Sequence, residues 1–371
     1  EGEWVQHAAY ITGSAENEYT GWSVALNNLG DVAAVGSPGY LSAGDVVQFP
    51  GRGSVRVYSE ENVSLRVGSL VNGASLNADG SRIVNNSPRS LNDAGEVSVS
   101  EWTGSSWSQL GQTIEGASDV ENSSGYIGDA DRLGSGGLNS DGSLLLTLAG
   151  GESSSANTGK AQVYQYNQSN STWETYGQQL EGVNNGDNLG KLGFISANGE
   201  DILIYTGDTD GLLQRYHYHL NQWDDTSQNP LAGIIASQRV FTTPDLEYIV
   251  YSADEFSTLN QATIYKWQPI TVGQYYVSSG RYNQHGTTFT GGTGDNLNCT
   301  AISPDGQRVV TVINSGVNKP GEVTVYEWSG TDWSQIGQTI IGLTSSQNAG
   351  DGSRLGVSAV INGDLLILGE P

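Results

Sequence analysis

Glu101–Gly116 reads EWTGSSWSQLGQTIEG and Glu327–Gly342 reads EWSGTDWSQIGQTIIG, so eleven of the sixteen residues are identical in these two stretches. A shorter copy, TWETYGQQLEG, occupies Thr172–Gly182. Self-similarity at intervals of several tens of residues is typical of repeat architectures such as propellers and solenoids. The fold therefore depends on what one repeat contains.

Each repeat contains four predicted strands, which we call A, B, C and D in chain order. Strands A and B are apolar runs around a tight turn, as in Gly137–Gly150 (GLNSDGSLLLTLAG) and Ala301–Val312 (AISPDGQRVVTV). Asn and Gly tolerate positive φ angles, so these turns predict β-hairpins. Strand C follows with the pattern Gly-x-Val-x-Val-Tyr, as in GEVTVYEW from Gly321, and the Trp-x-Gln stretch is strand D.

An apolar anchor recurs in strand A of seven units: Leu26, Leu76, Leu138, Ile195, Phe241, Ile302 and Ile361. Seven four-stranded units predict an all-β protein, a seven-bladed β-propeller of four-stranded antiparallel blades. A solenoid is the alternative, although its repeats are usually shorter, about 20–45 residues. Residues 1–371 would form this single domain, with approximate units 14–73, 74–116, 134–182, 190–233, 234–280, 295–342, and 353–371 plus 1–13.

The fourth and fifth units are degenerate, but Leu212–Trp223 and Gln261–Trp267 still fit strand C. Aromatic residues occupy equivalent i, i+2 positions of other C strands, in the pairs Tyr164/Tyr166, Tyr216/Tyr218 and Tyr326/Trp328. Residues two apart on a strand share one face. These pairs therefore predict aromatic contacts between neighbouring blades.

The two ends of the sequence fit one unit. Glu1–Gly13 (EGEWVQHAAYITG) has the strand D pattern, and Gly356–Pro371 supplies strands A and B. The last blade is therefore predicted to be closed by N-terminal strand D together with C-terminal strands A and B. Strand C of that blade would come either from further residues of a longer polypeptide or from another polypeptide by β-augmentation. Proteins usually cover an open sheet edge, so something should fill this one.

These units resemble the FG-GAP-type repeats of the integrin α-subunit N-terminal propeller, and more closely the related repeats of large extracellular proteins of marine microbes and algae. The resemblance rests on Gly36–Pro38 (Gly-Ser-Pro) and Gly369–Pro371 (Gly-Glu-Pro), together with the strand C and strand D patterns. It implies a seven-bladed propeller that serves in adhesion or assembly, without catalysis. The calcium loop of that family is replaced here by short turns such as Ser140–Gly142, which offer fewer than the roughly six to eight oxygen ligands of calcium.

Charge and composition limit the partners. Lys and Arg number 15 against 40 Asp and Glu, a net charge of −25. Nucleic acid needs a basic footprint and is excluded, and no stretch approaches the roughly 18 apolar residues of a membrane-spanning helix. A secreted or cell-surface glycoprotein is expected, with sequons at Asn62, Asn85, Asn122, Asn167, Asn170 and Asn298. The single cysteine, Cys299, excludes an internal disulfide and is either a small buried hydrophobe or a reactive thiol.

Several polar residues are candidate metal ligands. An Asp precedes strand A in four units, at Asp131, Asp187, Asp295 and Asp351, where it would form either an Asx turn or part of a shared cation site, calcium included. Asp208 and Asp210 lie in GDTDG, which is either a surface turn or a metal site. His217 and His219 share one face of a predicted strand and are either solvated or, with a third ligand, zinc-binding.

The sequence carries no nucleophile elbow, phosphate loop or Cys/His metal spacing, so no catalytic residue or cofactor is assigned and the chain is not expected to be an enzyme. Gln274–Thr293 departs from the repeat. Four of its residues could contact a partner or glycan: Tyr275, Tyr276, Tyr282 and His285. A degenerate outer strand with a long loop is the alternative.

Three functions remain open at this point. The first is a non-catalytic extracellular module for adhesion or assembly, bound to other extracellular proteins or to copies of itself. The second is a glycan-binding lectin, favoured by the many Tyr and Trp residues. The third is a hydrolase or lyase that acts on glycans with paired carboxylates at the central channel.

Overall fold

The computed structural model describes residues 3–6, 10–11, 20–21, 23–27, 31–37, 54–59, 65–68, 75–87, 94–116, 133–150, 158–184, 186–206, 211–229, 231–234, 239–252, 260–270, 279–292, 295, 297–313, 321–342, 355–356 and 358–369. Within these ranges the regular elements are β-strands, and they form seven sheets, which we number in chain order. Among the described residues there is no helix with the length and apolar character to cross a membrane.

The first three sheets follow the predicted A-B-C-D order. The first contains β1 (Ser23–Leu26), β2 (Val32–Ser37), β3 (Ser54–Ser59) and β4 (Leu65–Gly68). The second contains β5 (Ser75–Leu76), β6 (Arg82–Ser87), β7 (Glu96–Trp102) and β8 (Trp107–Glu115). The third contains β9 (Gly134–Leu138), β10 (Leu144–Ala149), β11 (Lys160–Asn167) and β12 (Thr172–Thr175), with β13 (Leu180–Glu181) also paired to β11.

The remaining sheets keep this order with additions. The fourth contains β14 (Gly193–Ile195), β15 (Asp201–Thr206), β16 (Gly211–His219) and β17 (Gln222–Asp225), with β19 (Leu231–Ile234) paired to β16. The fifth contains β20 (Arg239–Thr242), β21 (Tyr248–Ser252), β22 (Gln261–Pro269) and β23 (Gly280–Gln284), with β24 (Phe289–Thr290) on β22 and β18 (Ser227–Asn229) parallel to β23. The sixth contains β25 (Leu297–Ile302), β26 (Arg308–Ile313), β27 (Glu322–Trp328) and β28 (Trp333–Ile341). The seventh contains β29 (Ser358–Asn362) and β30 (Leu365–Gly369).

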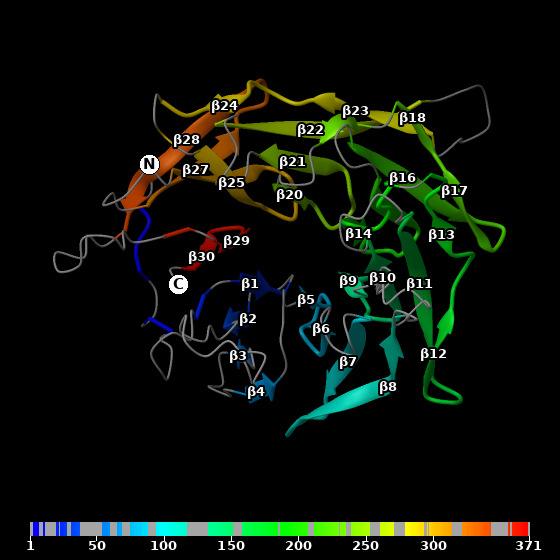
Figure 1. Cartoon of the computed structure of the whole chain (residues 1–371). Coiled ribbons are helices and arrows are strands. Elements are labelled where there is room, and N and C mark those ends of the chain that lie inside the picture. The colour runs from blue at the N-terminus through cyan, green and yellow to red at the C-terminus, as the bar shows by residue number, and fades with distance from the viewer. Residues whose placement is uncertain are drawn as a thin grey trace, which may run out of the picture.

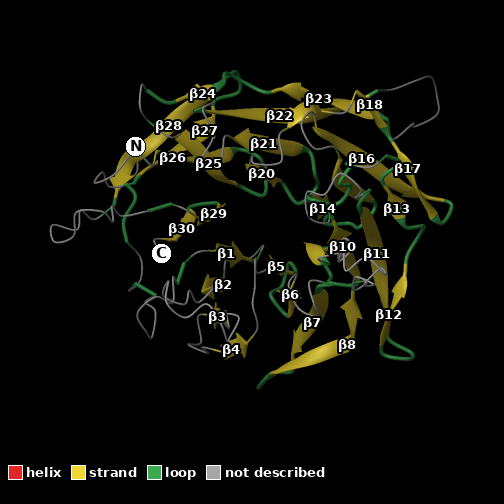
Figure 2. Ribbon diagram, viewed as in Figure 1, coloured by secondary structure: helices red, strands yellow, loops and turns green. Residues whose placement is uncertain are grey.

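The sheets are arranged around a common centre, with strand A of each nearest to it (Figures 1 and 2). All seven predicted anchors lie on these inner strands, as predicted for strand A. The A–B turns also bond to one another near the centre. The N–H of Ala78 donates to the Ser140 carbonyl at 2.9 Å, and the N–H of Ser140 donates to the Ala197 carbonyl at 2.8 Å. Neighbouring sheets are therefore held in register at their inner ends.

The core lies between the faces of neighbouring sheets. All six residues of β10 are buried, because side chains on both of its faces pack against other sheets. This explains why the B strands are continuous apolar runs rather than alternating ones. Two residues of the predicted aromatic pairs contact a neighbouring sheet. Tyr218 of β16 stacks on Tyr176, directly after β12, with ring centroids 4.1 Å apart. The ring centroid of Tyr326 on β27 lies 4.6 Å from that of Phe289 on β24.

Two sequence assignments need correction. Leu212–Trp223 is not one strand, since β16 ends at His219, the chain turns at Leu220 and Asn221, and Trp223 belongs to strand D. Both turn residues have positive φ angles although neither is a glycine, so the sequence gives no glycine signal for this turn. The fifth unit extends beyond residue 280, because β23 and β24 complete it. The degenerate outer strand expected within Gln274–Thr293 is thus present at Gly280–Gln284.

Candidate functional site

A Trp and a Gln join neighbouring sheets at the D strands, and we call this arrangement the Trp–Gln clasp. Gln112 of β8 donates from Nε2 to the Trp173 carbonyl at 2.8 Å and accepts the Trp173 N–H at 2.8 Å. The Trp173 indole donates to the Leu110 carbonyl at 2.8 Å. A Cβ on Gly111, with φ 73°, would meet the Trp173 ring at 2.7 Å. The Leu-Gly-Gln motif is therefore required because the next sheet's indole packs against the glycine.

The clasp recurs between the third and fourth sheets, where Gln178 bonds both backbone groups of Trp223 at 2.7 Å. It recurs again at the N-terminal end of the chain. Gln338 of β28 donates to the Trp4 carbonyl at 2.8 Å and accepts the Trp4 N–H at 2.9 Å. Trp4 therefore lies against the sixth sheet as strand D of a following sheet would.

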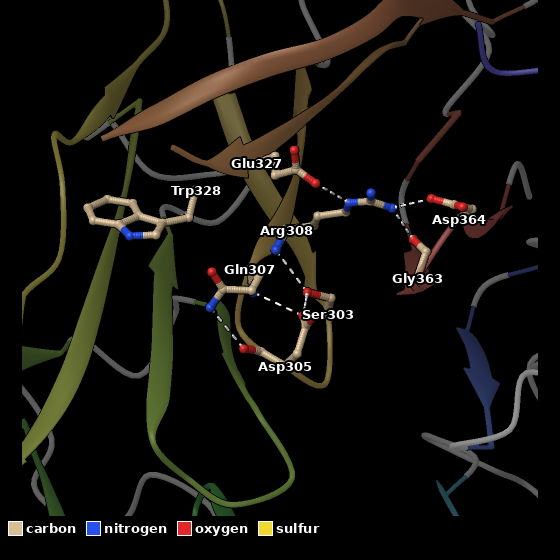
Figure 3. A pocket seen from close by; sticks show the side chains of 8 residues that line it. All are labelled: Ser303, Asp305, Gln307, Arg308, Glu327, Trp328, Gly363 and Asp364. Carbon is tan, nitrogen blue, oxygen red and sulfur yellow. Dashed lines mark hydrogen bonds and ion pairs between the residues drawn. The ribbon is translucent and has the colours of Figure 1, made fainter. Parts of the chain in front are cut away.

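The seventh sheet is attached to the sixth at its inner end. Arg308 of β26 donates to the carboxylate of Glu327, to the Gly363 carbonyl and to the carboxylate of Asp364, at 3.0, 2.6 and 2.7 Å (Figure 3). The hydrogen bond to Asp364 raises the pKa of Arg308 above its ordinary value. The cavity at this junction, about 340 Å³, is lined by these side chains, which already bond one another. Arg82 makes the same link from Glu101 to the Gly142 carbonyl of the third sheet.

The seventh sheet also meets the first. Ser358 on β29 donates to the Gly21 carbonyl at 2.6 Å, just before β1. Trp4, Leu366 and Leu368 all pack against one apolar cluster centred on Val310 and Ile361. The N-terminal segment and the C-terminal hairpin thus share a core, as expected if both belong to one unit.

The outer edge of β30 has no strand partner among the described residues. Leu366 and Ile367 occupy the positions of Val309 and Val310 in the sixth sheet, since Leu366 pairs with Ile361 as Val309 pairs with Ile302. Val309 and Val310 are 0% exposed, whereas Leu365–Leu368 remain half-buried. We call the backbone and side chains of Leu365–Leu368 the β30 edge. An edge of this kind can bind an extended peptide through main-chain hydrogen bonds.

The predicted acidic sites contribute to loops where they are described. Asp187 accepts the N–H groups of Val183 and Asn184 at 2.8 and 2.7 Å, and Asp295 accepts that of Gly292 at 2.9 Å. Each carboxylate therefore closes its own turn. Four others lie outside the described residues: Asp131, Asp208, Asp210 and Asp351.

The paired histidines have separate partners. His217 Nδ1 lies 3.2 Å from Asp201, and His219, 64% exposed, lies 3.9 Å from Asp224. Within the ranges that the structure describes, no three His, Cys, Asp or Glu side chains lie close enough together to hold a metal ion.

Two predicted contact or glycan residues, Tyr282 and Asn85, are corrected by their burial, and the predicted contact at His285 is not tested. Tyr282 is buried and donates from its hydroxyl to the Leu246 carbonyl, so it cannot serve as a surface contact. His285 is half-buried, with its ring 3.8 Å from that of Trp328, and burial lowers the pKa of His285. Asn85 is buried and bonded to Ser100, which leaves no room for a glycan.

Asn167 and Asn170 lie at the solvent-facing hairpin between β11 and β12, where each donates to Glu174. Asn298 and Cys299 are on β25, and their side chains are outside the description. The remaining candidates also lie outside the described residues: Tyr275, Tyr276, Asn62 and Asn122.

The sequence analysis quoted the Trp-x-Gln and Gly-Gln motifs but assigned no role to the second Gln or to the arginines at the start of β6 and β26. Recurrence of the Gln at the same distance from the Trp was the signal that could have identified it. The partner of each Gln lies in the next unit, 61 residues away for Gln112 and Trp173. A motif within one unit does not reveal that pairing.

Comparison with known proteins supports the architecture alone. No protein-family model matches the sequence. No curated protein matches it either. The chain is similar in structure to the β-propeller domain of Swd1 from Myceliophteria thermophila, with a TM-score of 0.56, 12% identity, and 95% and 92% of the two chains covered. The chain has a β-propeller fold. A candidate 6-phosphogluconolactonase from Bacteroides uniformis (TM-score 0.54, 12% identity, coverage 87% and 86%) and Kuenenia stuttgartiensis hydrazine synthase (0.53, 12%, 98% and 99%) are also similar to this propeller.

Proposed function

We propose that this propeller is a non-catalytic module of an extracellular assembly or adhesion structure, and that it binds other polypeptides at the β30 edge. The proposed ring has seven blades and is closed by the N-terminal segment as strand D and by β29 and β30 as strands A and B. The observation that carries the proposal is the two-stranded seventh sheet, whose outer edge has no partner among the described strands.

Closure is supported on both sides of the seventh sheet. Gln338 bonds Trp4 with the geometry of the internal clasps, and Ser358 bonds the backbone of Gly21 beside β1. Arg308 adds a bond to Gly363 at the inner end. The Gln338 and Arg308 contacts repeat those that join other sheets, and all three favour a ring whose last blade is assembled from both parts of the chain.

The chemistry of the described surface favours binding over catalysis. In the cavity beside Arg308, the guanidinium is already bonded to Glu327 within the sixth sheet and to Gly363 and Asp364 of the seventh. The net charge of −25 keeps a protein soluble and monodisperse until a complementary partner binds. The resemblance to FG-GAP-type repeats and the exposed sequon at Asn170 favour an extracellular location. Burial of Tyr282 removes one of the residues that favoured a lectin.

The test is selection of displayed random peptides on the full chain, with Leu366→Pro as the counter-selection variant. Proline removes a main-chain donor and cannot join a ladder. We expect peptides that bind the wild-type chain and not the variant, and that slow amide exchange on β30. Circular dichroism and thermal unfolding check that the variant is folded; if it is not, N-methylated versions of the selected peptides replace it. Selected peptides that leave exchange on β30 unchanged would contradict the proposal.

A further inference from the structure

We infer that the β30 edge takes one extended segment of a separate polypeptide, which carries alternating apolar residues and an aromatic residue that contacts Trp4. This inference rests on the proposed function and adds the chemistry of the partner. The six complete sheets show what a strand in this position must supply, since each places strand C between strands B and D.

The main-chain register follows from the sixth sheet. There the Trp328 N–H donates to the Gln307 carbonyl at 2.8 Å, so residue 307 faces β27, and Val309 and Thr311 face it by alternation. Leu366 takes the place of Val309, so the main-chain groups of Leu366 and Leu368 face the outer edge of β30. The incoming strand is therefore antiparallel to β30 and bonds these two residues.

The apolar requirement follows from burial. On β27, Val323 and Val325 are 0% and 1% exposed because they pack into the core between sheets. Their partners on β26 are Val312 and Val310. In the seventh sheet the corresponding surface belongs to half-buried Ile367 and buried Gly369, which take these two places. Residues two apart share one face of a strand. An occupant with Val or Ile at i and i+2 would bury this surface, whereas a polar strand would not.

The aromatic requirement follows from a contact that recurs in five sheets. An aromatic residue of strand C contacts one of strand D in the pairs Trp102–Trp107, Tyr166–Trp173, Tyr218–Trp223, Trp267–Tyr282 and Trp328–Trp333, with centroids 4.9–5.6 Å apart. Trp4 packs against the apolar cluster beside the sixth sheet but makes no such ring contact within the described residues. An incoming Tyr or Trp would complete the pair.

The N-terminal segment beside this position presents apolar surface. Val5, Tyr10 and Ile11 are 79%, 72% and 42% exposed, and all three follow Trp4 on this segment. Figure 1 shows the described parts of this segment, in dark blue, on the side of the molecule that holds β28 and the β29–β30 hairpin. Exposed apolar groups gathered on one segment mark an interaction surface. The occupant would therefore contact both β30 and the N-terminal segment.

The occupant differs from a second copy of this chain. Every described C strand already has both edges paired, so a copy would have to unfold a blade to donate one. Two chains of net charge −25 also repel each other. A separate polypeptide without net negative charge meets neither obstacle.

The experiment uses the full chain and the peptide GKVTVYKWS, which is Gly321–Ser329 with Glu322→Lys and Glu327→Lys. Its matched control, GKVTVSKSS, lacks the Tyr and Trp. Titration calorimetry measures both affinities, and hydrogen exchange follows Leu366 and Leu368. We expect the aromatic peptide to bind at least tenfold more tightly and to slow exchange at these two amides. On a Trp4→Ala chain we expect the two affinities to converge, since the aromatic partner is gone.

Equal affinities of the two peptides for the wild-type chain, with exchange slowed on β30, would overturn the aromatic requirement while the proposed function stands. If neither peptide binds and light scattering shows that the chain self-associates, a second copy is the occupant and the inference is overturned, again without loss of the assembly function. If neither peptide binds and the chain stays monomeric while no displayed peptide selects β30, both proposals fall.

Discussion

At the scale of single residues, the sheets are joined by side chains that bond main-chain groups of the next sheet. Gln112 contributes both a donor and an acceptor to Trp173, and its neighbour Gly111 leaves room for the Trp173 indole. Each hydrogen bond of this kind contributes about 0.5–1.5 kcal/mol to the free energy of unfolding, and the Gln makes two of them. The glutamine of the clasp should therefore be among the most sensitive polar positions of the chain.

Gln112→Ala tests this sensitivity. The substitution leaves the Trp173 N–H and carbonyl without partners, so we expect a loss of about 1–3 kcal/mol in the free energy of unfolding. Urea denaturation followed by fluorescence measures it. Gln109→Ala is the matched control, because Gln109 is exposed and bonds only within β8. Equal losses in the two variants would show that the clasp does not stabilise the junction.

His285 makes stability depend on pH. Burial lowers the pKa of His285 from 6.5, aided by the nearby charge of Lys266 and opposed by that of Glu247. The unfolded chain therefore takes up the proton first, and the stability present above about pH 6.5 is lost as pH falls toward the folded-state pKa. We expect the unfolding midpoint of the wild type to fall relative to that of His285→Phe between pH 7.5 and pH 5. The exposed His219 provides the control, and a constant difference would refute the assignment.

At the scale of elements, one type of link recurs with different burial. Arg215 on β16 bonds Asp201 and reaches the Leu246 carbonyl in the A–B turn of the fifth sheet, as Arg308 reaches Gly363 in the seventh. The Arg215 and Asp201 side chains are 9% and 14% exposed, whereas the Asp364 partner of Arg308 is 96% exposed. The two links are geometrically similar, but the buried Arg215 link should contribute more to the free energy of unfolding than the exposed Arg308 link.

Arg215→Met should be much more damaging than Arg308→Met. Removing Arg215 leaves the buried Asp201 carboxylate without its main partner, and breaking such a pair costs about 3–5 kcal/mol. An exposed pair contributes about 0.2–1 kcal/mol. Guanidinium denaturation of both variants gives the two losses. If Asp201→Asn combined with Arg215→Met restores no stability, the uncompensated charge is not the cause.

The sequence was sufficient to predict the strand order because the turn residues and apolar runs that define the strands lie within each unit. Local chemistry accounts for the correct anchors from Leu26 to Ile361. It could not reveal that strand D divides in the third sheet, where Gly177 has φ 76° between β12 and β13, while the equivalent Gly111 lies within continuous β8. The candidate site was predicted as a missing strand C, but its aromatic requirement depends on contacts between strands far apart in the sequence.

At the scale of the whole molecule, the proposed ring would depend on the fewest covalent links at the seventh sheet. The internal sheets are connected through the chain, but the N-terminal segment is held to the sixth sheet by Gln338 and by the packing of Trp4. Elements with few buried contacts open locally at low free energy. Opening of this junction would therefore precede unfolding of the other sheets.

Gln338→Ala should release the N-terminal segment without unfolding the internal sheets. We expect amide exchange at Trp4 to accelerate at least tenfold, since the Trp4 N–H loses its acceptor. Exchange in β10 should stay slow, because all of its side chains are buried between neighbouring sheets. Gln335→Ala is the matched control, as Gln335 is exposed and bonds only within β28. Faster exchange in β10 together with Trp4 would mean that closure and the internal sheets form one cooperative unit, and that the seventh blade cannot open alone to admit a partner strand.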